Sequence, residues 1–89
     1  MALQFMRNAQ GKEIDFVVLK NQKPWFAVEC KTDDRQLSKQ ISYYAERTNI
    51  PNFFQVHLKT KDYEVKEYRT RVLPFHKFCE WLKTNLPKI

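Results

Sequence analysis

Four charged side chains stand out near the start of this 89-residue chain, because the residues around them are mostly apolar. They are Glu13 and Asp15 in the run EIDFVVLK, and Glu29 and Lys31 in the run WFAVECK. Carboxylate oxygens are the ligands that Mg²⁺ and Mn²⁺ prefer. A lysine beside such a metal can orient a water or stabilise charge that develops on a phosphate. These residue types therefore fit metal-assisted phosphodiester chemistry.

The two runs predict a β-hairpin. Residues 13–20 and 25–31 are rich in β-forming side chains, and NQKP (21–24) between them is typical of a turn. If the numbers of opposed residues sum to 44, the acids meet on one face, since side chains alternate along a strand. The pairs on that face are Glu13–Lys31, Asp15–Glu29, Val17–Ala27 and Leu19–Trp25. The other face is apolar and carries Ile14, Phe16, Val18, Phe26, Val28 and Cys30. A slip of one residue would separate the acids.

Two interpretations of the acidic pair stay open. Carboxylates opposed at about 5 Å repel by roughly 3 kcal/mol at an effective dielectric constant near 20, and a divalent cation would remove that repulsion. Alternatively, the charges form a solvated rim at the end of the hairpin, with Lys31 neutralising the acids. The pattern alone does not decide between a metal site and a rim.

Composition limits the class of protein. Eighty-nine residues make a single domain, and 43% hydrophobic content is typical of a globular chain. The net charge of +6 permits attraction to a polyanion such as DNA. Neither a membrane span nor a secretory signal is recognisable. Cys30 and Cys79 therefore indicate reduced thiols in the cytoplasm, with one disulfide as the alternative. His57 and His76 stand apart, which does not fit a zinc site.

The remaining elements follow from periodicity. Residues 3–8 form a strand candidate, and AQGK after them reads as a turn. A helix is expected over 35–48, capped by Asp33 or Asp34 and carrying an apolar stripe. That stripe contains Leu37, Ile41, Tyr44, Ala45 and Thr48. Strands are expected at 53–58 and 63–69, and a last helix after Pro74 with the stripe Phe75, Phe78, Leu82 and Leu86. The order βββ-α-β-β-α predicts a mixed α/β sheet with helices packed on it.

The hairpin resembles a known family of sites. GKEIDFVV followed by PWFAVECK is similar to motifs II and III of the PD-(D/E)XK, or restriction-endonuclease-like, superfamily. The more specific resemblance is to the C-terminal domain of unknown function found on bacterial and archaeal AAA-type ATPases. It extends over about residues 5–82, through GKEIDF, PWFAVECK and LSKQISYYAERTNIPNFFQVHL.

The resemblance implies roles for individual residues. Asp15 and Glu29 would bind Mg²⁺ or Mn²⁺, with the backbone carbonyl of Cys30 as a third metal ligand. Lys31 would be the catalytic lysine, and Glu13 an accessory acid. Arg35 and Lys39 are candidate DNA contacts.

A second motif carries less information. Gln40 and Tyr44 resemble the Gln-x-x-x-Tyr helix of RecB-type nucleases, which would make Gln40 an accessory site residue. Tyr44 also lies on the apolar stripe of the expected helix, so plain core packing is the alternative explanation for this pair.

The chain also departs from the superfamily pattern. Superfamily nucleases usually begin with a helix that adds another acidic group, and nothing before Leu3 can be that helix. No phosphate-binding loop of an ATPase is present either. We therefore expect the C-terminal fragment of a larger ATPase, or an incomplete site. Three functions follow: a Mg²⁺-dependent phosphodiesterase acting on DNA, a catalytically silent module that binds DNA or protein, and a module for self-association or contact with the ATPase domain. The isolated chain is expected to be inactive, and no membrane partner is expected.

Overall fold

The fold is one mixed β-sheet with a helix on each face. The computed structural model describes residues 2–7, 13–32 and 36–85, with side chains from Ile14 onward. The strands are β1 (Ala2–Arg7), β2 (Glu13–Lys20), β3 (Lys23–Cys30), β4 (Phe53–His57), β5 (Tyr63–Val65) and β6 (Thr70–Pro74). The helices are α1 (Lys39–Arg47) and α2 (Phe75–Asn85), with a 3₁₀ turn, η1, at Lys66–Tyr68. In the described part, no helix has the length and apolar character needed to cross a membrane.

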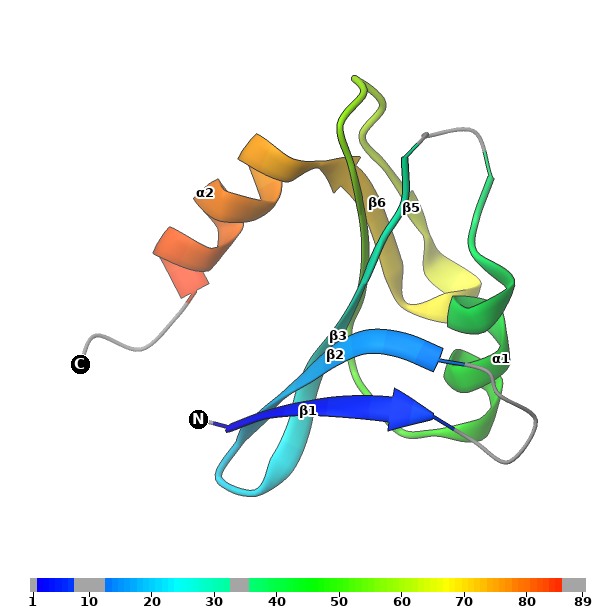
Figure 1. The fold of residues 1–89 in the computed structure, drawn as a ribbon, viewed down its shortest axis with the longest axis vertical. Coiled ribbons are helices and arrows are strands. Elements are labelled where there is room, and N and C mark those ends of the chain that lie inside the picture. The colour runs from blue at the N-terminus through cyan, green and yellow to red at the C-terminus, as the bar shows by residue number, and fades with distance from the viewer. Residues whose placement is uncertain (1, 8–12, 33–35, 86–89) are drawn as a thin grey trace.

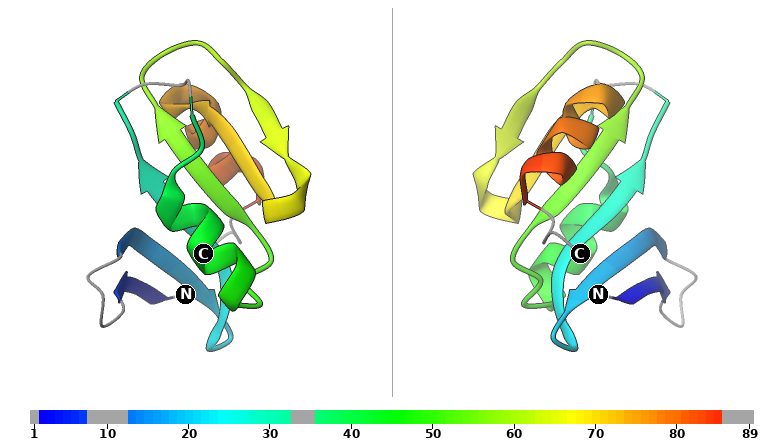
Figure 2. Two further views of the ribbon diagram at one scale, coloured as in Figure 1. Left: turned by 90° about the vertical axis from the view of Figure 1, so that its right-hand side faces the viewer. Right: turned by 90° about the vertical axis from the view of Figure 1, so that its left-hand side faces the viewer.

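The strand order is β1-β2-β3-β4-β6-β5 (Figure 1). The first three strands pair antiparallel, whereas β3, β4 and β6 run parallel and β5 returns antiparallel at the edge. α1 connects β3 to β4 across one face, and α2 lies on the opposite face (Figure 2). The carboxyl ends of β3, β4 and β6 therefore lie side by side at one end of the strands. This is the end of a parallel sheet at which α/β proteins commonly bind ligands.

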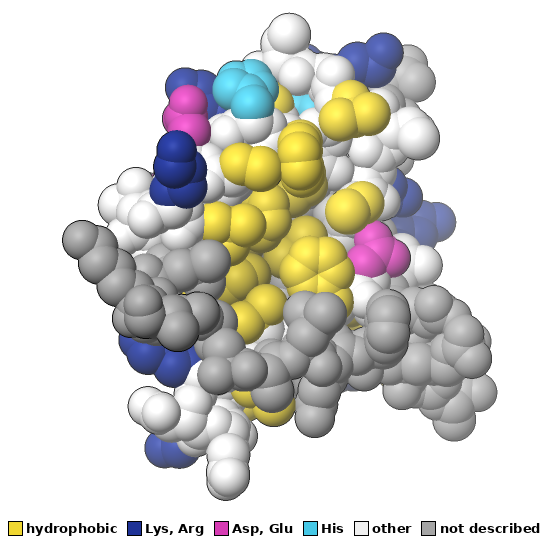
Figure 3. Space-filling model, turned by 60° about the vertical axis from the view of Figure 1, so that its left-hand side comes forward, with side chains coloured by type: hydrophobic (Ala, Val, Ile, Leu, Met, Phe, Trp, Pro, Cys, Tyr) yellow, Lys and Arg dark blue, Asp and Glu magenta, His cyan; other side chains and the backbone are white. Residues whose placement is uncertain are grey.

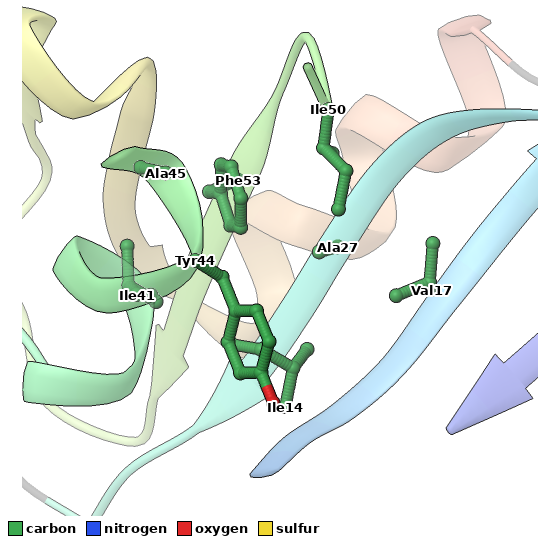
Figure 4. Packing of buried hydrophobic residues seen from close by; sticks show 8 residues of the cluster. All are labelled: Ile14, Val17, Ala27, Ile41, Tyr44, Ala45, Ile50 and Phe53. Carbon is green, nitrogen blue, oxygen red and sulfur yellow. The ribbon is translucent and has the colours of Figure 1, made fainter. Parts of the chain in front are cut away.

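Each helix packs against the sheet through its own hydrophobic cluster. The α1 cluster contains Ile14, Val17, Ala27, Ile41, Tyr44, Ala45, Ile50 and Phe53, and in Figure 4 the Tyr44 ring reaches from α1 toward Ile14. The α2 cluster contains Val18, Phe26, Val28, Phe54, Val56, Leu73 and Phe78. Four further members of it are only partly buried, namely Phe16, Trp25, Trp81 and Leu82. Hydrophobic side chains are accordingly visible at the surface on this side of the molecule (Figure 3).

The hairpin turn is shorter than the sequence indicates. Asn21 and Gln22 have φ values of 54° and 66°, as the two central residues of a type I′ turn require. Lys23 and Pro24 consequently belong to β3 and not to a four-residue loop. The ladder shifts register after Val18, so Leu19 pairs with Pro24 and the predicted pair with Trp25 is wrong. The predicted pair Val17–Ala27 is confirmed.

The first helix begins later than predicted. α1 starts at Lys39 because the Ser38 hydroxyl accepts the Gln40 N–H at 3.1 Å, which is the N-cap bond. The predicted caps Asp33 and Asp34 lie outside the described residues. Leu37 precedes the helix, yet it packs against the α1 cluster as expected.

The second half of the chain contains a strand that periodicity missed. The predicted strand 63–69 ends at Val65, and Arg69 turns the chain with a left-handed φ of 53°. Residues 70–74 then form β6, parallel to β4. The mixed sheet with flanking helices is confirmed, with one strand more than predicted. In α2, Phe78 is buried but Phe75 is 54% exposed, so Phe75 is not part of the buried stripe. Leu86 lies outside the described residues.

Candidate functional site

A β-bulge in β2 sets the position of Asp15. Ile14 pairs with Met6 of β1 and Val17 pairs with Gln4, so two residues of β2 stand opposite one residue of β1. The extra residue breaks the alternation of side chains, and Ile14 and Val17 both enter the α1 cluster although they lie three residues apart. The prediction that Ile14 shares a face with Phe16 is therefore wrong, since Phe16 packs on the α2 side.

The carboxylate of Asp15 links β2 to β3 by a hydrogen bond at the open end of the hairpin. The β2–β3 ladder ends at the pair Phe16–Val28, so Asp15 and Glu29 are not the ladder pair that the register predicted. Instead, Asp15 Oδ2 accepts the backbone N–H of Cys30 at 2.7 Å. A hydrogen bond to an ionised acceptor is stronger than a neutral one, so the bulge directs a charged side chain onto the backbone beside Glu29.

Glu29 is a buried acid with one buried oxygen that has no partner among the described residues. The residue is 8% exposed, and no donor among the described residues reaches its Oε2 atom. Burial raises the pKa of Glu29 to about 7, the charge of Asp15 adds to the rise, and the charge of Lys31 opposes it. A buried carboxylate oxygen without a donor is costly, and a bound cation is one way to compensate for it.

Lys31 follows directly after β3 and is exposed. Its backbone N–H donates to Val56 O at 2.8 Å, which continues the pairing of β3 with β4 by one bond. Its ammonium group acts on Glu29 through space and lowers the pKa of that acid. Glu13 lies opposite Arg7 in the β1–β2 ladder, and its side chain is outside the described part. The structure therefore does not test the predicted approach of Glu13 to Lys31.

The Cys30 thiol is exposed and free, as is the half-buried Cys79 thiol. Burial raises the pKa of the Cys30 thiol, and the neighbouring Asp15 carboxylate raises it further. Cys30 therefore favours the protonated thiol, and only its backbone carbonyl remains as a candidate ligand. Within residues 14–32 and 36–85, no group of three or more His, Cys, Asp or Glu side chains is arranged to hold a metal ion.

Gln55 is a residue that the sequence analysis did not single out. It lies in the middle of β4, fully buried, next to Glu29 in the β3–β4 register. Gln55 Oε1 accepts the Ser38 N–H at 2.6 Å, and Gln55 Nε2 donates to Gln36 O at 2.7 Å. The signal was present, because FFQVH places one amide inside an otherwise buried strand, and a buried amide must find partners.

The remaining predicted residues lie around the start of α1. Gln40 contacts Ser38, since its Oε1 accepts the Ser38 hydroxyl at 3.0 Å and its N–H donates to the same oxygen. Tyr44 is buried in the α1 cluster, in agreement with core packing. Lys39 is exposed at the first position of α1. Arg35 lies outside the described residues.

His57 closes the connection between β4 and β5. Its ring is buried, with Nδ1 accepting the Lys59 N–H at 3.0 Å and Nε2 lying 2.7 Å from Lys61 O. These two contacts require the tautomer that is protonated at Nε2. His57 is thus a packing residue with both ring nitrogens in use.

Comparison with known families places this chain. A family model described as Domain of unknown function (DUF4143) matches residues 1–78. The chain belongs to this family. Its description names no activity, so membership supports the resemblance to a domain of unknown function but adds no chemistry. Comparison with curated proteins and with solved structures found no match.

Proposed function

We propose that this DUF4143 domain is a nuclease-like module that binds Mg²⁺ or Mn²⁺ through Asp15 and Glu29 and acts on the phosphodiester backbone of DNA. The observation that carries the proposal is the Glu29 carboxylate, which is buried beside a second acid and has an oxygen without a partner among the described residues. Structural carboxylates in a core are normally satisfied by donors. A cation ligand that awaits its metal accounts for the missing donor.

The donor set fits a magnesium site completed by substrate. Mg²⁺ commonly binds one or two carboxylates, keeps several waters, and takes further oxygens from a bound phosphate. Asp15, Glu29 and the Cys30 carbonyl follow one another around the end of the hairpin, and all three offer oxygen. The absence of a third acidic, histidine or cysteine side chain among the described residues agrees with a cation bound partly by substrate and not by protein alone.

The protein groups around the carboxylates have separable tasks. Asp15 accepts the Cys30 N–H and so fixes the peptide that joins Glu29 to Cys30. The exposed Lys31 ammonium is free to approach a phosphate that lies over the strand end, where it would stabilise developing negative charge. A bound divalent cation would supply Lewis acidity to that phosphate. Lys39 at the start of α1, together with the net charge of +6, would attract the DNA backbone.

The second candidate is a module without catalysis that binds DNA or protein for an AAA-type ATPase. It is favoured by the exposed Lys31 side chain, whose ammonium group is held by no hydrogen bond or ion pair among the described residues. Catalysis requires groups held to within about 1 Å, so an unfixed lysine and two carboxylates suffice for binding more readily than for cleavage. Under both candidates we expect the isolated domain to bind DNA with an affinity that falls with salt, and to cut it poorly.

Mn²⁺ titration followed by water-proton relaxation tests the proposal. The wild-type domain should bind Mn²⁺ saturably, and both Asp15→Asn and Glu29→Gln should abolish that binding. Glu80→Gln is the matched control, because Glu80 is an exposed acid on α2. Equal Mn²⁺ binding by all four proteins would refute the metal site. Metal binding without cleavage by a longer chain that includes an upstream helix would favour the silent module.

A further inference from the structure

Gln55 makes the pair of contacts that a neighbouring strand would make. Its amide oxygen accepts the N–H of Ser38 and its amide nitrogen donates to the carbonyl of Gln36. Burying an amide without partners is costly, and both ends of this amide are satisfied by backbone. The side chain thus ties residues 36–38 to β4, and Ser38 in turn caps α1.

Gln55 and Glu29 lie side by side on the α1 face. Ala27 and Phe53 are register partners that both belong to the α1 cluster, and Glu29 and Gln55 are the partners two residues further on. Because side chains alternate along a strand, these two also point to the α1 side, on strands about 4.8 Å apart. The segment held by Gln55 therefore passes close to Glu29.

The burial of Glu29 needs a cover from outside its own strand. Glu29 is the second-last residue of β3, where a side chain normally meets solvent, yet it is 8% exposed. Gln55 pairs with Glu29 in the β3–β4 register and is bonded to residues 36 and 38, so we infer that residues 36–38 and the first turn of α1 provide this cover. Both are fixed through Ser38, and Ser38 is fixed by Gln55.

We propose that Gln55 is a positioning residue of the site: its amide holds residues 36–38 over Glu29 and thereby shapes the place where the cation binds. The inference deepens the proposed function, on which its metal-binding part rests. Ligands that are oriented by a fixed outer shell bind metal more tightly, and loss of an outer-shell partner typically costs about ten- to a hundredfold in affinity.

The test compares two variants, each of which replaces a buried polar side chain by an apolar one. Gln55→Met removes both hydrogen bonds and keeps the length of the side chain. Thr70→Val is the control, because it removes one buried hydrogen bond, from Thr70 Oγ1 to Tyr68 O, at the amino end of β6. Two readouts are taken on each folded protein. One is Mn²⁺ affinity, and the other is carbodiimide-driven coupling of glycine ethyl ester to Glu29, located by mass spectrometry with exposed Glu80 as internal reference.

In Gln55→Met we expect severalfold more coupling at Glu29, unchanged coupling at Glu80 and about tenfold weaker Mn²⁺ binding. Thr70→Val should lose thermal stability but keep both readouts. Unchanged coupling at Glu29 in folded Gln55→Met, or an equal change in Thr70→Val, would overturn the role of Gln55. If the wild type binds no Mn²⁺, the proposed function fails, and the coupling result still decides the role of Gln55.

A second variant covers the case in which Gln55→Met does not fold. Gln55→Leu removes the same two hydrogen bonds with a shorter, branched side chain. It should raise coupling at Glu29 in the same way. Loss of the fold in both variants would identify Gln55 as a core residue and overturn the proposal.

Discussion

Asp15 and Cys30 are joined by a hydrogen bond in which the carboxylate Oδ2 accepts the backbone N–H at 2.7 Å. This bond lies beyond the last pair of the β2–β3 ladder, Phe16–Val28. The bulge in β2 changes the direction of the Asp15 side chain, so that it points to the Cys30 backbone. The acid that the sequence marks as a metal ligand therefore also holds the end of a strand. The structural role and the proposed metal-binding role of Asp15 can be separated by experiment.

Asp15→Ala should destabilise the domain in the absence of metal. The substitution leaves the Cys30 N–H without its charged acceptor, and we expect a loss of about 1–2 kcal/mol in the free energy of unfolding. Urea unfolding at pH 5 is the appropriate measurement, since Glu29 is then largely protonated and its repulsion with Asp15 is small. Glu80→Ala, which breaks only an exposed contact with Lys77, should cost about 0.5 kcal/mol or less. Equal losses in the two variants would contradict a structural role for Asp15.

Glu29 should make stability fall as pH rises. Its pKa is about 7 in the folded chain and near 4.5 when unfolded, so the folded state holds more protons between these values. Stability is therefore lost from about pH 4.5 to pH 7, by at most about 3 kcal/mol. Glu29→Gln should flatten this dependence and be more stable than wild type at pH 8. Urea unfolding of both proteins at pH 5 and pH 8 measures the change in stability with pH. The same change in wild type and Glu29→Gln would show that Glu29 is not its source.

Mn²⁺ binding should weaken below neutral pH. The cation competes with the proton on Glu29, whose pKa is about 7, so the apparent affinity should fall about tenfold per pH unit below that value. Titrations at pH 6 and pH 8 measure the slope. Any residual Mn²⁺ binding by Glu29→Gln should not show this dependence on pH. A wild-type affinity that is independent of pH over this range would exclude Glu29 as a ligand.

Gln22→Gly should stabilise the hairpin. Gln22 has a φ of 66°, a region in which glycine is unstrained and other residues are not. Asn-Gly is also the preferred pair for a type I′ turn, so we expect a gain of about 1 kcal/mol in thermal or urea unfolding. Lys23→Gly is the control, because Lys23 already lies in β3 and should lose stability on the same change. A loss in both variants would show that the turn is not the strained element.

Local sequence patterns were sufficient to predict the hairpin strands and the apolar face of α1. Strand 13–20 matches β2 because its β-branched and aromatic residues are bounded by turn residues, and the stripe through Ile41 and Tyr44 packs where periodicity expected it. The short turn was missed because positive φ at Asn21 and Gln22 leaves no glycine signal. β6 was missed because TRVLP is only five residues long and leads directly into α2.

The residues of the candidate site could be named from the sequence, but their geometry could not. Asp15 and Glu29 were identified from their types and spacing, whereas the bulge that separates them from the ladder depends on pairing with β1. Gln55 lies more than twenty residues beyond the hairpin, and its role appears only when β4 is placed beside β3. Such long-range pairing is not encoded in any one segment.

The bond between Gln55 and Ser38 closes a loop of 17 residues, and it can form only after β4 has docked on β3. The hairpin of β2 and β3, by contrast, turns over two residues and can form within microseconds. We therefore expect an order of folding in which the acids are assembled first, on a hairpin that is still open to water, and Glu29 is covered later. A chain caught between these steps would carry an ionised Glu29 at neutral pH, so completing the fold should take up about half a proton at pH 7 and more at lower pH, as far as the pKa of the uncovered acid.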